Sequence, residues 1–253
     1  MAKRNIIIIG YPKSGTTWLS RLVAELVSCP LQGDWGYEGI KALYKEGTDR
    51  YSNYQVYKSH HSFNELEKAS SLTIHKRIYI LRDPRDVVVS GLYYFRFLPK
   101  LLAIKEGLTL SPVLKKTYNK LVSKKEKKRQ MIQAVLHGNN NLNSWLKLSW
   151  NNHYLPYHKE NILFIKFEDL IDSPETECKK ILAYLGVSSS EDHIKKSIEK
   201  QSFQERKKNN SNKKQLNKLL RKGIYGNWKK ELSKTEISLF KEKLKESNNF
   251  YTF

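Results

Sequence analysis

The chain has 253 residues, 39% hydrophobic and 28% charged, a balance typical of a folded globular protein and not of a disordered one. Lysine and arginine number 46 against 25 aspartates and glutamates, which gives a net charge of +21. Such an excess attracts anions, whether nucleic acid, an acidic membrane surface, or phosphorylated and sulfated small molecules. Because many of the lysines occur in short runs, such as residues 124–129, we expect most of them on solvated helix faces and loops.

The cysteines, Cys29 and Cys178, stand far apart in the sequence and do not have the spacing of a metal site or a disulfide framework. We therefore expect two ordinary thiols, no metal site and a cytoplasmic location. The apolar part of the N-terminal segment is too short for a signal peptide, and no apolar run is long enough to cross a membrane. Residues 92–102 mix aromatic and basic side chains, and we favour an apolar pocket over a membrane contact for this segment.

The predicted strands and helices alternate along the chain. β-rich runs lie at residues 5–9, 55–58, 77–81 and 161–167, and the first contains four consecutive isoleucines, as expected of a strand that is buried on both faces. Helices are predicted at 16–27, 84–97, 112–136, 142–157, 174–185, 191–201 and 235–246, and a long surface loop at 203–227. This order predicts an α/β fold, with a parallel sheet flanked by helices, in a single domain of residues 1–253.

A candidate phosphate loop follows the first predicted strand and opens the first helix. A helix start with glycines nearby cradles an anion, because its backbone N–H groups point outward and glycine allows close approach. The loop adds one lysine and several hydroxyls to these N–H groups; its candidate binding residues are Lys13, Ser14, Gly15, Thr16, Thr17 and Trp18. In the phosphate loop of nucleoside-triphosphate-binding proteins the lysine follows the second glycine, whereas here Lys13 precedes Gly15. The sequence also has no clear acidic residue at a strand end to hold Mg²⁺. The loop therefore predicts a P-loop-like three-layer fold and disfavours a kinase.

Other candidate residues lie downstream. Arg82 ends a predicted strand and Ser90 follows on a helix, so that Arg82 either grips a phosphate or forms a structural ion pair. Lys58 and His60 point to one face of an extended segment, as a charge-stabilising lysine and a general base require, although a lone histidine is more often structural. The remaining candidates are one aromatic residue for a nucleotide base, with core packing as its alternative, and a basic clamp: Phe203, Arg221, Lys222 and Gly223.

Six segments, in this order, resemble motifs of the cytosolic-type sulfotransferase family: residues 11–18, 58–60, 82–90, 167–169, 201–203 and 221–228. The resemblance implies 3′-phosphoadenosine 5′-phosphosulfate (PAPS) as sulfuryl donor, adenosine 3′,5′-bisphosphate (PAP) as product and no required metal. It implies that His60 is the general base and that Lys13, Lys58 and Ser90 assist. Arg82 and Ser90, with the clamp at 221–223, would hold the 3′-phosphate, and Trp18 and Phe203 the adenine.

The sequence also departs from the family pattern. Phe167 stands where a tyrosine is usual, Asn227 replaces a frequent acid, and the C-terminal dimer motif is missing from residues 229–234, which leaves the oligomeric state open. The resemblance implies in-line transfer to a small-molecule hydroxyl or amine, with acceptor specificity in residues 31–54 and 98–160, and with no nucleic-acid partner. The alternatives are a P-loop small-molecule kinase and, below it, a basic nucleic-acid-binding protein.

Overall fold

The computed structural model describes residues 3–37, 45–99, 102, 110–209, 223–244 and 251. The chain divides into two compact units, each assembled from separate stretches of sequence. The first unit contains residues 1–10, 14–82 and 156–223, and the second contains residues 11–13, 83–155 and 224–253. The loop after the first strand therefore contributes residues to both units. The assignment of residues 1–253 to one domain stays a prediction.

The first unit is built on a parallel sheet of five strands in the order β2-β3-β1-β4-β5. The strands are β1 (Arg4–Ile9), β2 (Leu31–Asp34), β3 (Tyr54–Ser59), β4 (Ile74–Leu81) and β5 (Leu163–Lys166). β1 lies between β3 and β4, and all four of its isoleucines are fully buried. A strand that is covered on both faces needs this composition, which explains why the central strand is the most hydrophobic of the five.

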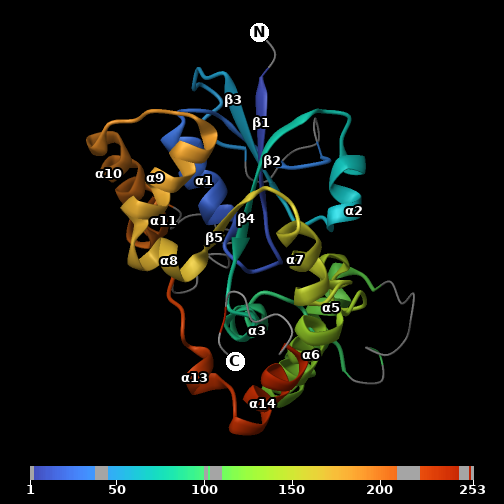
Figure 1. Cartoon of the computed structure of the whole chain (residues 1–253). Helices are drawn as coiled ribbons and strands as arrows, with labels where there is room; N and C mark the ends of the chain where they lie inside the picture. Colours follow the sequence, from blue (N-terminus) through green and yellow to red (C-terminus); the bar gives the residue numbers. More distant parts are fainter. Residues whose placement is uncertain are drawn as a thin grey trace. The chain divides into compact units, whose positions relative to one another are not determined.

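Helices cover both faces of this sheet. Figure 1 shows α1 (Thr16–Leu26) and α8 to α11 on one side and α2 (Phe63–Leu66) on the other. The helices of the first group that follow β5 are α8 (Phe167–Asp172), α9 (Pro174–Leu185), α10 (Glu191–Lys200) and α11 (Phe203–Asn209). The core on that side joins apolar residues of α1, α9 and α10 to the strands. The predicted three-layer α/β arrangement is confirmed.

The second unit is helical. Its elements are α3 (Pro84–Leu92), α5 (Pro112–Leu121), α6 (Lys124–His137), α13 (Trp228–Glu231) and α14 (Lys234–Lys243), with a 3₁₀ turn at Ser144–Leu146. α7 (Trp150–His158) contributes residues to both units. α3 packs on α6 through Gly91, where an added Cβ would lie 2.5 Å from Sδ of Met131. The glycine therefore sets a close approach between these two helices.

Several predicted elements differ from the structure. The helix predicted at 112–136 is two helices, because Ser123 begins α6 by accepting a hydrogen bond from the Glu126 backbone N–H. The helix predicted at 84–97 ends at Leu92, and the one predicted at 142–157 begins only at Trp150. Residues 203–209, predicted as loop, form α11, while residues 210–222 lie outside the described residues. Asp83 caps the start of α3 with its side chain, and Gly186 ends α9 in a left-handed conformation.

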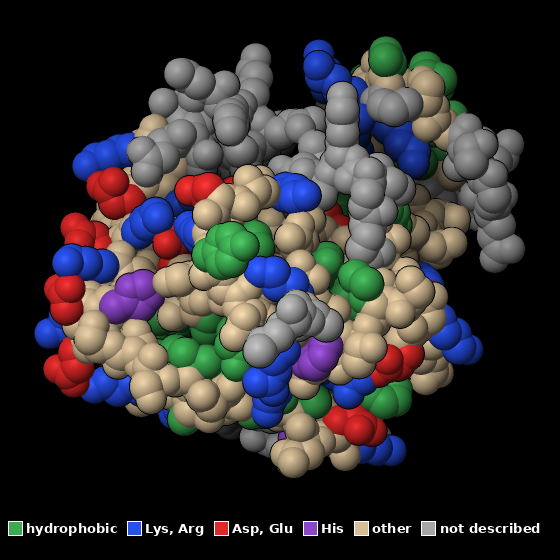
Figure 2. Space-filling view, turned by 90° about the horizontal axis from the view of Figure 1, so that it is seen from above, with side chains coloured by type: hydrophobic (Ala, Val, Ile, Leu, Met, Phe, Trp, Pro, Cys, Tyr) green, Lys and Arg blue, Asp and Glu red, His purple; other side chains and the backbone are tan. Residues whose placement is uncertain are grey.

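The charge excess is partly balanced by local ion pairs. In the basic run of α6, Lys124 pairs with Glu231 at 2.8 Å, Lys128 with Glu236 at 2.9 Å and Arg129 with Glu126 at 2.6 Å. On the face that Figure 2 shows, basic side chains stand among acidic and uncharged ones. The basic run therefore lies on a helix surface and has acidic partners, which fits the expectation that most of these lysines lie on solvated helix faces.

Both cysteines are buried and free, and burial raises the pKa of each thiol to about 12. They are accordingly protonated and unreactive at neutral pH, as predicted for ordinary thiols. Among the helices of the described residues, none combines the length and hydrophobicity that crossing a bilayer requires.

Candidate active site

The loop between β1 and α1 needs glycine at two positions, one for its backbone conformation and one for a close contact. Gly15 adopts a left-handed conformation with φ 103° as the N-cap of α1, and an added Cβ would lie 2.8 Å from Cδ2 of Phe167. At Gly10 the same atom would lie 2.8 Å from Ile80. The hydrogen bonds of α1 begin with the Trp18 and Leu19 N–H groups, which donate to the Gly15 carbonyl at 3.0 Å, and the N–H groups of Thr16 and Thr17 precede them at the helix start, where anions bind. The loop therefore has the backbone of an anion cradle.

Lys58 lies on β3 directly beside β1, opposite Ile8 in the register. Its side chain is buried, and its Nζ forms an ion pair at 3.0 Å with Oδ1 of Asp34, the last residue of β2. Desolvation lowers the pKa of Lys58, and the carboxylate of Asp34 opposes that shift. Asp34 thus helps to keep a cation at this end of the sheet.

His60 follows β3 and faces the start of the phosphate loop. Its Nδ1 lies 2.8 Å from the carbonyl oxygen of Gly10. Because a carbonyl can only accept a hydrogen bond, Nδ1 must carry the proton in this contact. In the neutral ring Nε2 then holds the lone pair, which is the state that a general base needs. The neighbouring His61 lies with Nδ1 3.0 Å from Oγ of Ser59.

Arg82, Phe167 and Trp18 form a stack in the first unit. Arg82 is buried just after β4, and its Cζ lies 4.1 Å from the centre of the Phe167 ring. The Trp18 ring meets Phe167 edge to face, with 5.6 Å between the ring centres, and its Nε1 donates to the Gln201 carbonyl at 3.0 Å. The aromatic rings and one guanidinium are thus held together at the carboxyl end of the sheet, where α/β folds bind ligands.

Phe203 and Gly223 also lie against each other. Phe203 begins α11, and Gly223 has φ 62°. An added Cβ at Gly223 would come within 2.9 to 3.1 Å of three carbon atoms of Phe203. The glycine of the basic clamp therefore lets the backbone pass over this aromatic side chain. Arg221 and Lys222, the two cations of the clamp, lie outside the described residues.

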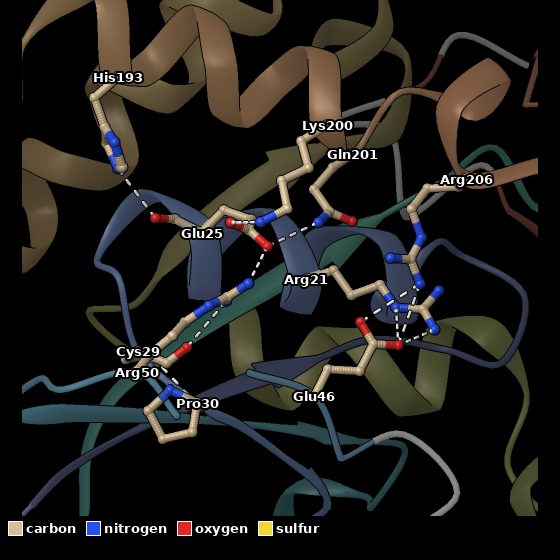
Figure 3. A network of polar contacts seen from close by, with 10 residues as sticks. All are labelled: Arg21, Glu25, Cys29, Pro30, Glu46, Arg50, His193, Lys200, Gln201 and Arg206. Carbon is tan, nitrogen blue, oxygen red and sulfur yellow. Dashed lines mark hydrogen bonds and ion pairs between the residues drawn. The ribbon is translucent and has the colours of Figure 1, made fainter. Parts of the chain in front are cut away.

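A polar network fixes the helices that carry these aromatics (Figure 3). Glu25 of α1 accepts hydrogen bonds from Arg50, Lys200 and Gln201. Glu46 accepts from Arg21 of α1 at 2.6 Å and from Arg206 of α11 at 3.2 Å. Two carboxylates thus bridge α1, α10, α11 and the segment 45–50. This bridging holds Trp18 and Phe203, which lie on α1 and α11, on a common support.

The second unit holds Ser90 and Lys13. Ser90 lies on α3, which begins with a buried pair: the carboxylate of Asp83 caps the helix and accepts three contacts of 2.6 to 3.1 Å from the Arg85 guanidinium. This pair gives Asp83 a structural role at the start of α3. Arg85 in turn lies over the ring of Trp228, with 3.8 Å from Cζ to the ring centre.

Asp86 ties the C-terminal motif to α3. Its buried carboxylate accepts hydrogen bonds from the backbone N–H groups of Gly226, at 2.5 Å, and Trp228, at 3.2 Å. These residues follow the basic clamp in sequence. The end of the clamp segment is therefore anchored by a residue of the Arg82-to-Ser90 motif, 140 positions away in the chain.

The sequence of this chain is similar to those of a known protein family. The family model described as the sulfotransferase domain matches residues 3–248, almost the whole chain. The chain belongs to the sulfotransferase domain family. Among curated members of the family, sulfotransferase 2A1 of Macaca fascicularis is 27% identical. The alignment, 267 positions long with its gaps, covers 95% of this chain and 84% of the relative. The 3-alpha-hydroxysteroid sulfotransferase of Cavia porcellus is 28% identical, covering 92% and 80% respectively.

Solved structures of sulfotransferases have the same fold. Mouse sulfotransferase SULT7A1, crystallised with PAP, superposes with a TM-score of 0.68 at 23% identity over 98% of this chain and 87% of its own. Retinol dehydratase, crystallised with androsterone and PAP, superposes with a TM-score of 0.62 at 19% identity over 100% of this chain and 83% of its own. At these identities the likeness concerns the fold.

The structure thus groups the predicted residues of this family member as follows. The first unit contains Ser14, Gly15, Thr16, Thr17, Trp18, Lys58, His60, Arg82, Phe203 and Gly223, and the second contains Lys13 and Ser90. Their roles in binding and catalysis stay predictions. Over the described parts of the chain, no cluster of three or more His, Cys, Asp or Glu side chains could hold a metal ion.

Three residues that shape the site are not among those predicted from the sequence. Phe167 carries the contact to Arg82, Asp34 pairs with Lys58, and Asp86 anchors the segment after the clamp. Phe167 had one signal, its place in a Phe-Glu-Asp segment that resembles a family motif. Asp86 likewise lies in the 82–90 segment that resembles a family motif, but the contacts of both aspartates are formed with residues distant in sequence and leave no local pattern.

Proposed function

We propose that this chain transfers a sulfuryl group from PAPS to a hydroxyl or amine of a small molecule, with His60 as the general base. The observation that carries the proposal is the contact between Nδ1 of His60 and the Gly10 carbonyl. It orients the ring beside the first residue of the phosphate loop and requires the proton on Nδ1, so that Nε2 is the basic nitrogen of the neutral ring.

The reaction is an in-line displacement at sulfur. Nε2 of His60 takes the proton of the acceptor as the acceptor atom forms its bond to sulfur. The bond from sulfur to the bridging oxygen of the 5′-phosphate breaks, and PAP leaves with the electron pair. Negative charge grows on that oxygen and on the sulfuryl oxygens, where Lys13, Lys58 and the loop N–H groups stabilise it. Positioning and fixed charge supply most of the acceleration, by analogy with phosphoryl transfer.

The same residues account for donor binding. The loop from Ser14 to Thr17 would hold the 5′-phosphosulfate, Arg82 and Ser90 the 3′-phosphate, and Trp18 with Phe203 the adenine. Arg221, Lys222 and Gly223 would close over the 3′-phosphate. The PAP bound in the two solved relatives supports this donor. The transfer itself uses no metal ion in this proposal, since the cations it needs come from the protein.

We further propose a small-molecule acceptor and a cytoplasmic location. Curated relatives are named for hydroxysteroids, and the retinol dehydratase structures contain androsterone or retinol. Small apolar alcohols are therefore the first class to test. The two buried, free thiols fit a reducing compartment.

The experiment is calorimetry with PAP, followed by transfer of radiolabelled sulfuryl from PAPS to panels of phenols, steroid alcohols, sugars and amines. Binding of PAP without Mg²⁺, together with a labelled acceptor, is the expected result. Mg²⁺-dependent transfer from ATP without PAP binding would favour a kinase. Steeply salt-dependent binding to nucleic acid without PAP binding would favour the second alternative.

A further inference from the structure

Lys13 reaches an aromatic ring outside the phosphate loop. Its Nζ lies 3.8 Å from the centre of the Tyr94 ring. A cation at this distance from an aromatic face is attracted by the negative charge density of the ring. Both residues belong to the second unit, so that the contact lies within one compact body.

The backbone on the lysine side is held in place. Lys13 has φ 72°, a left-handed conformation that is unusual for a residue with a side chain. Two residues earlier Tyr11 is fully buried, and its hydroxyl donates to the Ala134 carbonyl of α6 at 3.2 Å. Its ring also meets the ring of His153 edge to face. This anchor fixes the direction in which the Lys13 side chain leaves the loop.

The tyrosine side is held by the same helix. The Tyr94 backbone N–H donates to the Gly91 carbonyl at 3.0 Å, in the turn that ends α3. Gly91 allows α3 to pack closely on Met131 of α6. The Tyr94 ring stands edge-on to the mostly buried Phe95 ring, with 5.1 Å between centres. The segments that carry Lys13 and Tyr94 are therefore both packed against α6.

We propose that Tyr94 is a positioning residue that holds the Lys13 ammonium where it stabilises the transferring sulfuryl group. The inference rests on the proposed function for the role of Lys13, and it adds a residue outside the phosphate loop and the base. A ring suits this task because it holds an ammonium without neutralising it, whereas a carboxylate at the same place would cancel the charge. Tyr94 is 39% exposed, so that its ring faces partly outward beside Lys13.

The kinetic test compares Tyr94→Phe with Tyr94→Leu. The phenylalanine keeps the ring face and should stay within about 2-fold of the wild-type kcat, whereas the leucine should lower kcat by about 3- to 20-fold. In a Lys13→Ala background, Tyr94→Leu should change kcat by less than about 2-fold, because the residue it positions is gone. Equal loss from Phe and Leu, or an undiminished effect of Leu without Lys13, would overturn the proposal.

A second measurement needs no turnover. Without nucleotide, the rate at which dilute acetic anhydride modifies Lys13 is followed by peptide mass spectrometry. Tyr94→Leu should raise this rate several-fold and Tyr94→Phe should not, because the ring shields and attracts the protonated amine. The same rate in all variants would refute the contact. A shift in labelling without any sulfuryl transfer by the wild type would keep the contact and reject the proposed function.

Tyr51→Leu is the matched control. Tyr51 is 99% exposed, and the centre of its ring lies 5.4 Å from Nζ of Lys3. Replacing it by leucine therefore also removes a ring that lies near a lysine. It should change neither kcat nor the labelling of Lys13. A fall in kcat as large as that of Tyr94→Leu would show a general effect of the replacement and would contradict the specific role.

Discussion

Nδ1 of His60 lies 2.8 Å from the carbonyl oxygen of Gly10, the residue that follows the central strand. The same glycine donates its N–H to the Ser59 carbonyl at 3.3 Å. The two segments therefore extend each other's parallel pairing by one step past the sheet, and this step sets the tautomer of the imidazole. This backbone contact thus selects the tautomer in which Nε2 is the basic nitrogen.

Replacing His60 by alanine should lower kcat by about 10²- to 10⁴-fold, because the acceptor proton loses its receiver. PAP affinity should stay within about 3-fold, since the ring is not assigned to the donor. His61→Ala is the control, because that ring contacts Ser59 instead of Gly10. Calorimetry and transfer from PAPS measure both. Full activity of His60→Ala, or an equal loss of kcat in His61→Ala, would show that His60 is not the general base.

Asp34→Asn should destabilise the fold by about 1–3 kcal/mol at neutral pH, because it leaves the buried ammonium of Lys58 without its carboxylate. Desolvation already lowers the Lys58 pKa from its ordinary 10.5, and removing the carboxylate lowers it further. Between the folded and unfolded pKa values the unfolded chain binds more protons, so that stability rises with pH in that window. The loss should therefore be largest at low pH and shrink as pH approaches 10.5.

Urea unfolding of Asp34→Asn between pH 6 and about 10 measures this trend. The control is the double variant Asp34→Asn with Lys58→Met, which removes the buried charge together with its partner and should recover most of the lost stability. A loss that is independent of pH, or a double variant no more stable than Asp34→Asn, would show that the ion pair is not the cause.

The fold was predictable where the pattern is local. Ile6–Ile9 predict a strand buried on both faces, and the glycines that follow predict an anion-binding loop. Both predictions rest on residues that are adjacent in the sequence. β2 was not predictable in this way. Its sequence includes Gly33 and Asp34, which disfavour a strand, and it forms because it pairs with Val56 and Lys58 of β3. Tertiary pairing overrides local propensity there.

The site shows the same division. Short motifs predict the loop, His60 and Arg82, whereas a phenylalanine in place of the usual tyrosine at position 167 does not indicate a site residue. In the structure the ring itself matters, since it supports Arg82 and blocks a side chain at Gly15. Phe167 supports Arg82 and Gly15 through contacts between segments distant in sequence, and a single sequence contains no direct signal of such contacts.

Gly15→Ala should destabilise the fold and weaken PAP binding at least about 10-fold. The residue has φ 103°, and the added methyl group would collide with the Phe167 ring at 2.8 Å. Gly186→Ala is the matched control: its φ is 68°, but nothing lies within 4 Å of an added Cβ. It should therefore cost about 1 kcal/mol of stability and leave PAP affinity unchanged. Thermal unfolding and calorimetry of both variants provide the comparison, and equal PAP affinities would contradict the predicted crowding at Gly15.

Asp86→Ala should weaken binding of PAP by about 5- to 20-fold, because the Gly226 and Trp228 N–H groups lose their common acceptor and the segment after the clamp loses its anchor. Adenosine 5′-phosphosulfate, which lacks the 3′-phosphate, should bind within about 2-fold of the wild type. This split separates a positioning effect on the 3′-phosphate clamp from general unfolding, which would weaken both ligands.

A second variant with the same change of charge is the control for Asp86→Ala. Asp86→Ala removes one negative charge from a chain of net charge +21 and on that ground alone would favour an anion. Asp192→Ala removes the same charge from an exposed pair with Lys196 and should leave PAP affinity unchanged or slightly improved. Weaker binding in Asp86→Ala despite the added attraction would therefore come from the lost anchor. If both variants bound PAP alike, the Asp86 contacts would have no part in holding the donor.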